Sequence, residues 1–258
     1  MDFSDFGGAF LKKYLSLAAF LLILILVSCG NRSERYTIVA FGDSNTRGAN
    51  WTIRNYQDTD KWVNLIKSTL PVNDGQAFIH NAGVGGETTE DARKRFKRDV
   101  LKMDPDLVFI MFGTNDAVIL PNGKPKVDRA RFKENLLYYV REVRNAGGTP
   151  VLMTCLPIVE GNGNDKLYYT RYPKKLYAHT DGARNWHNSY NDITREVAFK
   201  NDITLIDNWT NMVKFAGGDS DEALLKSGII DPSGNHMTPQ GAELIYLSIL
   251  ESKVLGPK

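Results

Sequence analysis

Short apolar runs alternate along this chain with longer segments of helical periodicity, and this alternation constrains its fold more than any other feature. Such a pattern is typical of a mainly parallel β-sheet covered by helices on both faces. We therefore expect an α/β fold: a three-layer α/β/α sandwich with a five-stranded parallel sheet in the flavodoxin-like order 2-1-3-4-5. The expected strands are Tyr36–Phe41, Ala77–His80, Leu107–Phe112, Pro150–Thr154 and Thr204–Ile206.

Five helices are expected in the segments that link or follow these strands. They are Lys61–Leu70, Thr89–Lys102, Arg129–Asn145, Ala183–Lys200 and Pro239–Val254. Boundary signals support two of them. Thr88 with Asp91 three residues later resembles a capping box, and Thr238 supplies a capping hydroxyl before Pro239.

Two connections are longer than such a fold usually requires. The segment Thr46–Asp60 contains Trp51 and Tyr56, and the segment Leu156–Gly182 contains four tyrosines among basic residues. Long loops on a rigid sheet often carry binding residues, so Trp51 and Tyr56 are candidate substrate-binding side chains. A solvated rim without a binding role is the alternative.

The N-terminal segment is typical of an export signal. Lys12 and Lys13 precede an apolar run, residues 15–27, that is short for a bilayer span. The run ends in "LVSC", with Cys29 last, which resembles the lipobox of bacterial lipoproteins. An ordinary signal peptide or an uncleaved anchor helix is the alternative.

This resemblance divides the chain into three parts. Residues 1–28 are expected to be a lipoprotein signal peptide, residues 29–35 the lipidated Cys29 with a tether, and residues 36–258 a single domain. The expected location is the bacterial cell envelope, on its periplasmic or surface side, with the membrane contacted through the lipid anchor.

Composition argues against several classes of protein. The net charge is +2, from 32 Lys and Arg against 30 Asp and Glu, and no long basic run favours nucleic acid. Only Cys29 and Cys155 occur, so an intrachain disulfide framework is excluded. Cys155 lies in an apolar stretch and is expected in the core. No histidine pairs with cysteine or acidic ligands at a recognised spacing, so no metal site is expected.

Polar, glycine-punctuated segments follow the first three expected strands. They read "GDSN" from Gly42, "NAGVGGET" from Asn81 and "GTND" from Gly113. In the expected strand order these ends are neighbours, and ligands of open parallel sheets bind beyond the carboxyl ends of the strands. The three segments are therefore expected to meet at one site.

Ser44 lies in the first of these segments, between donors from the other two. Gly85 and Gly86 can bring backbone N–H groups close to a ligand, and Asn115 offers a side-chain amide. Such donors suit the oxyanion that forms when a hydroxyl attacks an ester carbonyl. A serine also needs a base, and His236 is the candidate because its turn-rich surroundings allow it to reach back over the sheet edge.

These four blocks, "GDSN", "NAGVGGETT", "GTND" and "NHMTPQG", resemble the GDSL esterase or lipase family, also called SGNH hydrolases. The resemblance covers essentially the whole chain after the signal. It implies that Ser44 is the nucleophile and donates its N–H to the oxyanion hole, together with the Gly86 N–H and the Asn115 amide. It also implies that His236 is the general base and acid, and that no cofactor is needed.

One position departs from the family pattern. The family usually has an aspartate three residues before the histidine, where this chain has Ser233. The nearest carboxylate is Asp231, five residues before His236, and a bulging loop would let it orient the imidazole. The alternative is a Ser-His dyad in which Ser233 or a backbone carbonyl holds the ring.

The sequence thus predicts an exported serine esterase that cleaves a short-chain acyl ester, acetyl above all, through an acyl-enzyme. Carbohydrate, lipid and small-molecule esters are all candidate substrates, since the family acts on each of them. A lysophospholipase, a thioesterase or an O-acetyltransferase with the same residues is an alternative. A further alternative belongs to a different functional class: a noncatalytic surface lipoprotein that binds glycan.

Overall fold

The structure is a computed structural model that describes residues 36–48, 57–70, 77–161 and 172–255. The expected signal peptide, Cys29 and the tether lie outside the described residues, as do Trp51 and Tyr56. Among the helices that the structure describes, none is long and apolar enough to cross a membrane.

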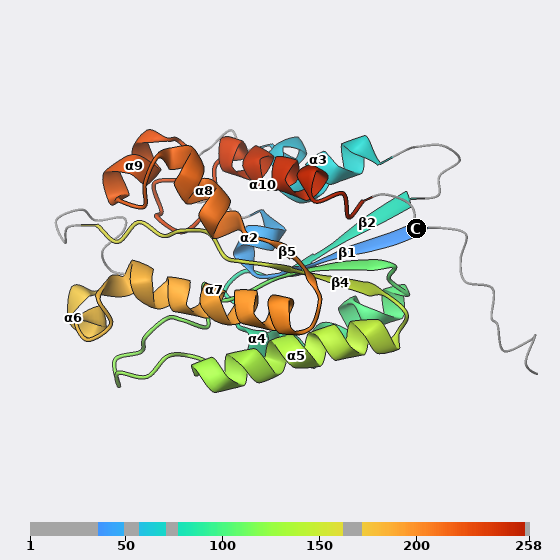
Figure 1. Ribbon diagram of the computed structural model, residues 1–258, viewed down its shortest axis with the longest axis horizontal. Helices are drawn as coiled ribbons and strands as arrows, with labels where there is room; N and C mark the ends of the chain where they lie inside the picture. The colour runs from blue at the N-terminus through green and yellow to red at the C-terminus, as the bar shows by residue number, and fades with distance from the viewer. Residues whose placement is uncertain (1–35, 49–56, 71–76, 162–171, 256–258) are drawn as a thin grey trace, which may run out of the picture. The chain divides into compact units, whose positions relative to one another are not determined.

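Among the described residues, parallel strands form one sheet in the order β2-β1-β3-β4-β5, which confirms the predicted topology (Figure 1). Their bounds are β1 (Tyr36–Gly42), β2 (Ala77–Gly83), β3 (Leu107–Met111), β4 (Thr149–Met153) and β5 (Thr204–Ile206). Side chains alternate between the two faces of each strand: Ile38 belongs to one buried cluster, and its neighbour Val39 belongs to the other.

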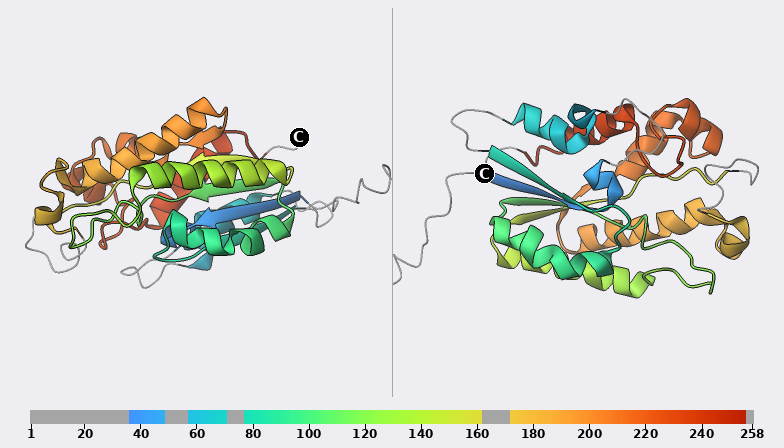
Figure 2. Two further views of the ribbon diagram at one scale, coloured as in Figure 1. Left: turned by 90° about the horizontal axis from the view of Figure 1, so that it is seen from below. Right: turned by 180° about the vertical axis from the view of Figure 1, so that it is seen from behind.

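Helices cover both faces of this sheet, as Figures 1 and 2 show. One layer holds α3 (Trp62–Thr69), α8 (Asn208–Ala216), α9 (Asp221–Lys226) and α10 (Pro239–Glu251), and the other holds α4 (Thr89–Asp99), α5 (Arg129–Asn145) and α7 (Gly182–Lys200). Shorter helices are α2 (Ser44–Arg47), η1 (Asp58–Asp60), η3 (Leu101–Met103) and α6 (Lys174–Tyr177). The capping box of Thr88 and Asp91 is present, and Thr238 caps α10.

Several predicted boundaries are wrong by a few residues. β2 continues past His80 to Gly83, because its last residues pair with the end of β1. α4 ends at Asp99 rather than at Lys102, and η3 follows it. α10 ends at Glu251, short of the predicted Val254. Helices α8 and α9, between β5 and α10, were not predicted.

Candidate active site

Ser44 is the first residue of α2, directly beyond the carboxyl end of β1. The Asp43 side chain caps this helix by accepting a hydrogen bond from the Asn45 N–H at 2.9 Å. The cap turns the chain abruptly from strand to helix. It thereby places the Ser44 hydroxyl at the top of the sheet, although the residue is only 8% exposed.

Neighbouring elements hold α2 in place through three hydrogen bonds. The Asn81 amide from β2 donates to the Thr46 carbonyl at 3.0 Å, and the Trp62 indole N–H from α3 donates to the Asn45 carbonyl at 3.1 Å. The Asn45 amide in turn donates to the Asn235 carbonyl at 3.2 Å. This last bond ties the serine helix directly to the segment that carries His236.

His236 lies against Ser44, although the two residues are 192 positions apart in the chain. Its Nε2 is 3.0 Å from the Ser44 Oγ, and the imidazole is only 2% exposed. The distance is a normal hydrogen bond and suits proton transfer. The structure thus brings together the hydroxyl and the ring that the sequence singles out.

A tight hairpin carries this histidine. Ile230 and Met237 form an isolated antiparallel bridge, and inside it the Asp231 N–H donates to the His236 carbonyl at 2.8 Å. The turn needs a residue with positive φ, which Gly234 supplies at 84°. The imidazole is therefore fixed by a closed loop rather than by the flank of a helix.

Ser233 lies between Asp231 and the far side of the imidazole. Its Oγ is 2.9 Å from His236 Nδ1, and its hydroxyl donates a short hydrogen bond to Asp231 Oδ1. Because the hydroxyl proton is directed to the carboxylate, the Ser233 oxygen can accept from Nδ1–H. In that tautomer Nε2 carries no proton and is directed at the Ser44 hydroxyl, as a general base would need to be.

The opposite side of Ser44 carries the predicted oxyanion donors. The Asn115 amide donates to the Glu87 carbonyl at 3.0 Å and to Asp43 Oδ2 at 3.3 Å, which fixes it between the glycine loop and α2. Gly86 has φ of 81°, a conformation that side chains rarely adopt. Both residues line the same cavity as Ser44 and His236.

That cavity has a volume of about 410 Å³. The described residues that line it are Ser44, Arg47, Gly85, Gly86, Asn115, Val118, Lys126, Tyr172, Asn235 and His236. Among these ten, Val118 is the only aliphatic side chain. Apart from the two glycines, the valine and the tyrosine, the residues next to the serine thus have polar or charged side chains.

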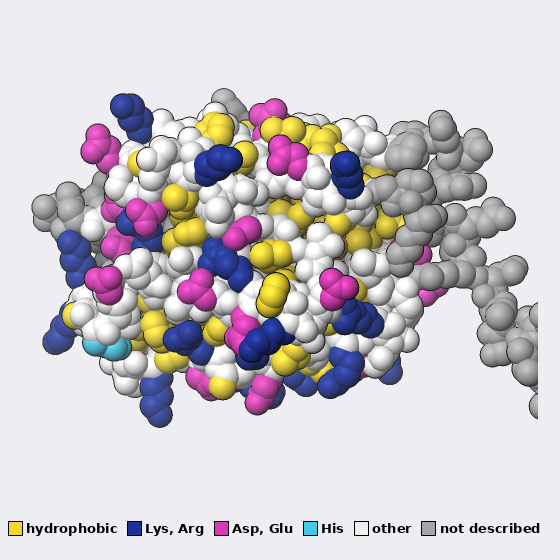
Figure 3. Space-filling view, viewed as in Figure 1, with side chains coloured by type: hydrophobic (Ala, Val, Ile, Leu, Met, Phe, Trp, Pro, Cys, Tyr) yellow, Lys and Arg dark blue, Asp and Glu magenta, His cyan; other side chains and the backbone are white. Residues whose placement is uncertain are grey.

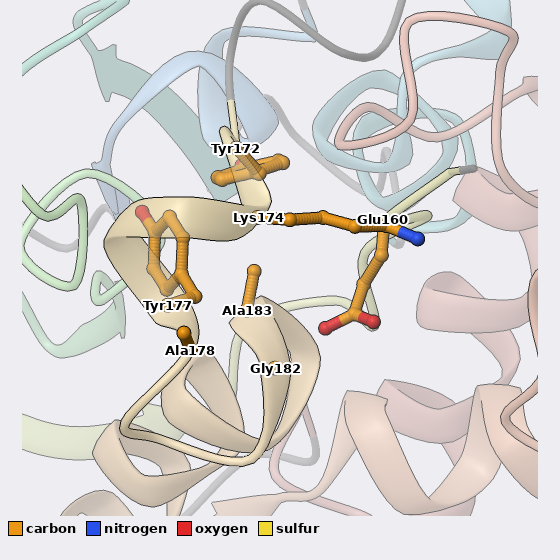
Figure 4. Close-up of a pocket in the computed structure, with 7 residues that line it drawn as sticks. All are labelled: Glu160, Tyr172, Lys174, Tyr177, Ala178, Gly182 and Ala183. Atoms are coloured by element: carbon orange, nitrogen blue, oxygen red, sulfur yellow. The ribbon is translucent and has the colours of Figure 1, made fainter. Parts of the chain in front are cut away.

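A second cavity of about 270 Å³ shares Tyr172 with the first (Figure 4). The close-up shows Tyr177 on one side of it, with the Lys174 side chain extending toward Glu160 on the other. Gly182 and Ala183, at the start of α7, form part of its wall. The shared tyrosine makes the two cavities neighbours.

Comparison with known proteins identifies this arrangement. A model of the GDSL-like Lipase/Acylhydrolase family matches residues 40–244. The chain belongs to this family. As a GDSL-like acylhydrolase it is a carboxylic ester hydrolase, and the strand order above is the α/β fold that the family shares.

Three relatives illustrate the likeness. The chain is 52% identical over 247 residues to the uncharacterized lipoprotein YqeF of Bacillus subtilis (strain 168), a match that covers 95% of this chain and 99% of that protein. It is 26% identical over 161 residues to an arylesterase of Vibrio mimicus, covering 62% of this chain and 74% of that protein. A solved catalytic mutant of Axe2, an acetylxylan esterase from Geobacillus stearothermophilus, shares the fold with a TM-score of 0.61 at 18% identity, covering 86% of this chain and 95% of that one.

Two buried carboxylates stand behind the site of this GDSL-like hydrolase. Desolvation by burial raises the pKa of Asp43 to about 7, and the hydrogen bond from the Asn45 N–H only partly offsets this. Burial likewise raises the pKa of Asp116 to about 6, although Thr89 donates to it through both its N–H and its hydroxyl. These contacts hold the loops that carry Ser44 and Asn115.

Two other titratable side chains, His187 and Cys155, are buried in the protein interior. His187 is buried, its Nδ1 is 2.7 Å from the Ala183 carbonyl, and desolvation lowers its pKa to about 4. Cys155 is a free, buried thiol whose pKa is raised by burial. Within the described residues, no group of three or more His, Cys, Asp or Glu side chains is arranged to hold a metal ion.

Arg47 and Lys126 line the cavity of this hydrolase but were not singled out from the sequence. A signal for each was available. Arg47 follows Ser44 by three residues, so the two share a face of any helix that begins at the serine. Lys126 lies in the loop after the third strand, the same loop that begins with Asn115. Neither spacing distinguishes a pocket residue from an ordinary exposed cation.

Proposed function

We propose that this chain is an exported, lipid-anchored serine esterase that removes a short acyl group, acetyl, from a carbohydrate through an acyl-enzyme. The observation that carries the catalytic part is the continuous chain of contacts from Ser44 through His236 and Ser233 to Asp231. It supplies a nucleophile, a base in the right tautomer, and a buried negative charge behind the base.

In this mechanism Ser44 attacks the ester carbonyl while His236 accepts its proton at Nε2. The Ser44 and Gly86 N–H groups stabilise the resulting oxyanion together with the Asn115 amide, one N–H of which turns from Asp43 Oδ2 to the oxyanion. Each donor contributes about 3 kcal/mol. The imidazolium then protonates the leaving alcohol, and the acyl group remains on Ser44. Water, activated by the same imidazole, releases the acid and restores the serine.

The shape of the catalytic cavity supports a short acyl group. A fatty acyl chain needs an apolar trough, whereas Val118 is the one aliphatic side chain among the described lining residues. Tyr172 and Tyr177 line the neighbouring cavity but are only 3% and 1% exposed, so the carbohydrate part of the proposal rests on analogy. The acetylxylan esterase that shares this fold supports an acetylated carbohydrate as the substrate.

Ser44→Ala and His236→Ala test the catalytic assignment. Each is expected to lower p-nitrophenyl acetate turnover by the purified chain by at least about 10³-fold, as loss of a catalytic triad member does. p-Nitrophenyl octanoate should be cleaved poorly, and acetate should be released from acetylated xylan. Turnover by Ser44→Ala at the wild-type rate would end the catalytic proposal.

The same assay separates hydrolysis from transfer. With an acceptor sugar present, the proposal expects free acetate and no acetylated acceptor. Accumulation of the acetylated sugar would instead favour the transferase alternative.

The anchor is proposed from the lipobox-like "LVSC" and from the name of the related lipoprotein YqeF. Cys29→Ser is expected to abolish labelling by radioactive palmitate and to move the protein from the membrane fraction to the soluble fraction. Unchanged labelling in Cys29→Ser would refute lipidation at this residue.

A further inference from the structure

The catalytic cavity carries positive charge without a matching negative one. Arg47 and Lys126 are among the ten described residues that line it, and none of those ten is Asp or Glu. The chain as a whole is nearly balanced at +2, so this local excess does not follow from composition. Acidic and basic side chains are interspersed over the face shown in Figure 3.

Arg47 is placed beside the reacting atoms by its helix. It is the last residue of α2, which begins with Ser44 and is terminated by Gly48 in the left-handed conformation. A Cβ added to Gly85 would lie 3.7 Å from Arg47 Nη1 and 3.7 Å from Ser44 Cβ. The guanidinium therefore lies next to the glycine loop and close to the nucleophile.

Lys126 is placed on the cavity wall by a small antiparallel turn. Its backbone N–H donates to the Val118 carbonyl at 2.9 Å, and Ile119 and Pro125 form a bridge just beyond. Val118 and Lys126 thus stand side by side, and both line the cavity. The loop therefore fixes the backbone of Lys126 at the cavity wall, within reach of a molecule bound there.

Three carboxylates beside the lining residues have other partners. Glu87 pairs with Arg95 at 2.6 Å, and Glu90 pairs with Arg131 at 2.7 Å. Asp43 is buried and caps α2. Among the described residues neither Arg47 nor Lys126 forms an ion pair, although both are exposed.

We propose that the esterase prefers an ester whose alcohol part carries a negative charge, which Arg47 and Lys126 bind. The inference rests on the proposed esterase function and narrows its substrate to acidic alcohols, such as an acidic sugar. The charge belongs to the alcohol part, because the acetyl group itself has none. A cleft lined by one sign of charge concentrates the opposite charge and orients it. The second cavity is not part of this argument, since an acidic and a basic side chain, Glu160 and Lys174, both line it.

Matched esters test the preference. The ratio of kcat/KM for para-acetoxybenzoate to that for the neutral para-acetoxybenzamide should be well above one and should fall as salt is added. Arg47→Gln and Lys126→Gln should each lower this ratio by about fivefold, the size expected for one charge contact near the surface. Circular dichroism and thermal unfolding confirm that the variants fold.

Lys124→Gln is the matched control, because Lys124 is exposed on the same loop but does not line the catalytic cavity. It should leave the ratio within about twofold of wild type, since an exposed charge outside the cavity is largely screened. A second pair, an O-acetylated methyl glucuronide and the corresponding glucoside, extends the test to sugars. Acetyl glycerol phosphate against acetyl glycerol shows whether phosphate serves as well as carboxylate, and a preference in any anionic arm supports the proposal.

The outcomes separate the two proposals. Hydrolysis that depends on Ser44 but shows the same ratio in wild type, Arg47→Gln and Lys126→Gln would overturn the anionic preference and leave the esterase intact. Hydrolysis of none of these esters in a Ser44-dependent way would overturn both.

Discussion

Ser233 stands where the family pattern has an aspartate, and its hydroxyl contacts the imidazole of His236 at Nδ1. The same hydroxyl donates to Asp231, so the negative charge acts on the ring through one intervening O–H group. A hydroxyl can fix the tautomer of the ring, but it stabilises an imidazolium less than a carboxylate in direct contact does. The orientation of the His236 imidazole should therefore depend on Ser233. The electrostatic stabilisation of the imidazolium should depend on Asp231.

Ser233→Ala removes the acceptor for the Nδ1 proton. It should lower kcat by about 10- to 100-fold with little change in KM, since a hydrogen bond to a charged group contributes about 1.5–3 kcal/mol. Steady-state kinetics with p-nitrophenyl acetate measure the two constants. The double variant Asp231→Asn, Ser233→Asp restores the family pattern and should retain more activity than Ser233→Ala.

Asp231→Asn tests the charge separately, through the pH profile. Loss of a nearby negative charge makes the imidazolium easier to deprotonate, so the acid limb of kcat/KM should move to lower pH. A carboxylate that only shapes the hairpin would leave the acid limb where it is, and that result would contradict the proposed role.

At the scale of elements, the position of Ser44, the proposed nucleophile, depends on how closely α2 approaches the end of β2. A Cβ added to Gly83 would lie 2.3 Å from the Arg47 nitrogen and 2.8 Å from the Thr46 carbonyl carbon, and both are backbone atoms. Backbone cannot yield as a flexible side chain can. A larger residue at this position must therefore displace α2, and Ser44 with it.

Gly83→Ala should consequently reduce activity at least about 10²-fold, because a small displacement of a reacting group lowers the rate by about this factor. It should also lower the free energy of unfolding by about 1–3 kcal/mol. The control is Gly217→Ala at the end of α8, where φ is 75° and no atom lies within 4 Å of the added Cβ. It should cost about 1 kcal/mol from backbone strain alone and leave turnover unchanged. Equal turnover in the two variants would rule out the proposed displacement.

The sequence predicts the sheet because each strand segment is rich in apolar and β-branched residues. This composition can be read from a short stretch of sequence without knowledge of the tertiary fold. The sequence predicts an end of β2 at His80, because asparagine and glycine, as at Asn81 and Gly83, are typical of loops. In the structure they pair with β1, and the Asn81 amide holds α2. Helix α8 was missed because its first residues are weak helix formers. It is stabilised by the Asp207 cap and the burial of Trp209.

The residues of the candidate site can be predicted from the sequence where a motif specifies both the residue type and its position in the chain. Ser44 and His236 are identified by their blocks, and the structure brings them to 3.0 Å. The contact between Ser233 and Nδ1 was only one of several alternatives, because it depends on how a hairpin closes around Gly234. The cavity position of Lys126 depends on a turn that periodicity does not encode.

At the scale of the whole molecule, two sets of charges respond to pH in opposite ways. Hydrogen bonds from Arg131 lower the pKa of Glu90 to about 2, and Lys200 does the same for Glu196. Such pairs support the fold at neutral pH and weaken as pH falls through the acid range. Asp43 and Asp116 have raised pKa values instead, so the stability linked to them is complete at low pH and is lost as pH rises toward 7.

Asp43→Asn isolates the second effect. Between pH 5 and pH 8 the wild type must ionise a carboxylate whose pKa is about 7 in the fold and near 4 in the unfolded chain. The free energy of unfolding of the wild type should therefore fall relative to that of Asp43→Asn, by about 2–3 kcal/mol over this range. The asparagine oxygen can still cap α2, and any cost of its amide facing Asn115 does not depend on pH.

Urea unfolding at pH 5, 6.5 and 8 measures this difference, and Ser44→Ala serves as a control in the same loop that adds or removes no charge. The difference between variant and wild type is the proper quantity, because His187, with its pKa lowered to about 4, opposes the trend in the absolute values. As pH falls, the unfolded chain protonates this histidine before the folded chain does, which destabilises the fold. A pH-independent difference between Asp43→Asn and wild type would mean that Asp43 ionises in the fold as easily as in water, so its burial would not govern the pH response.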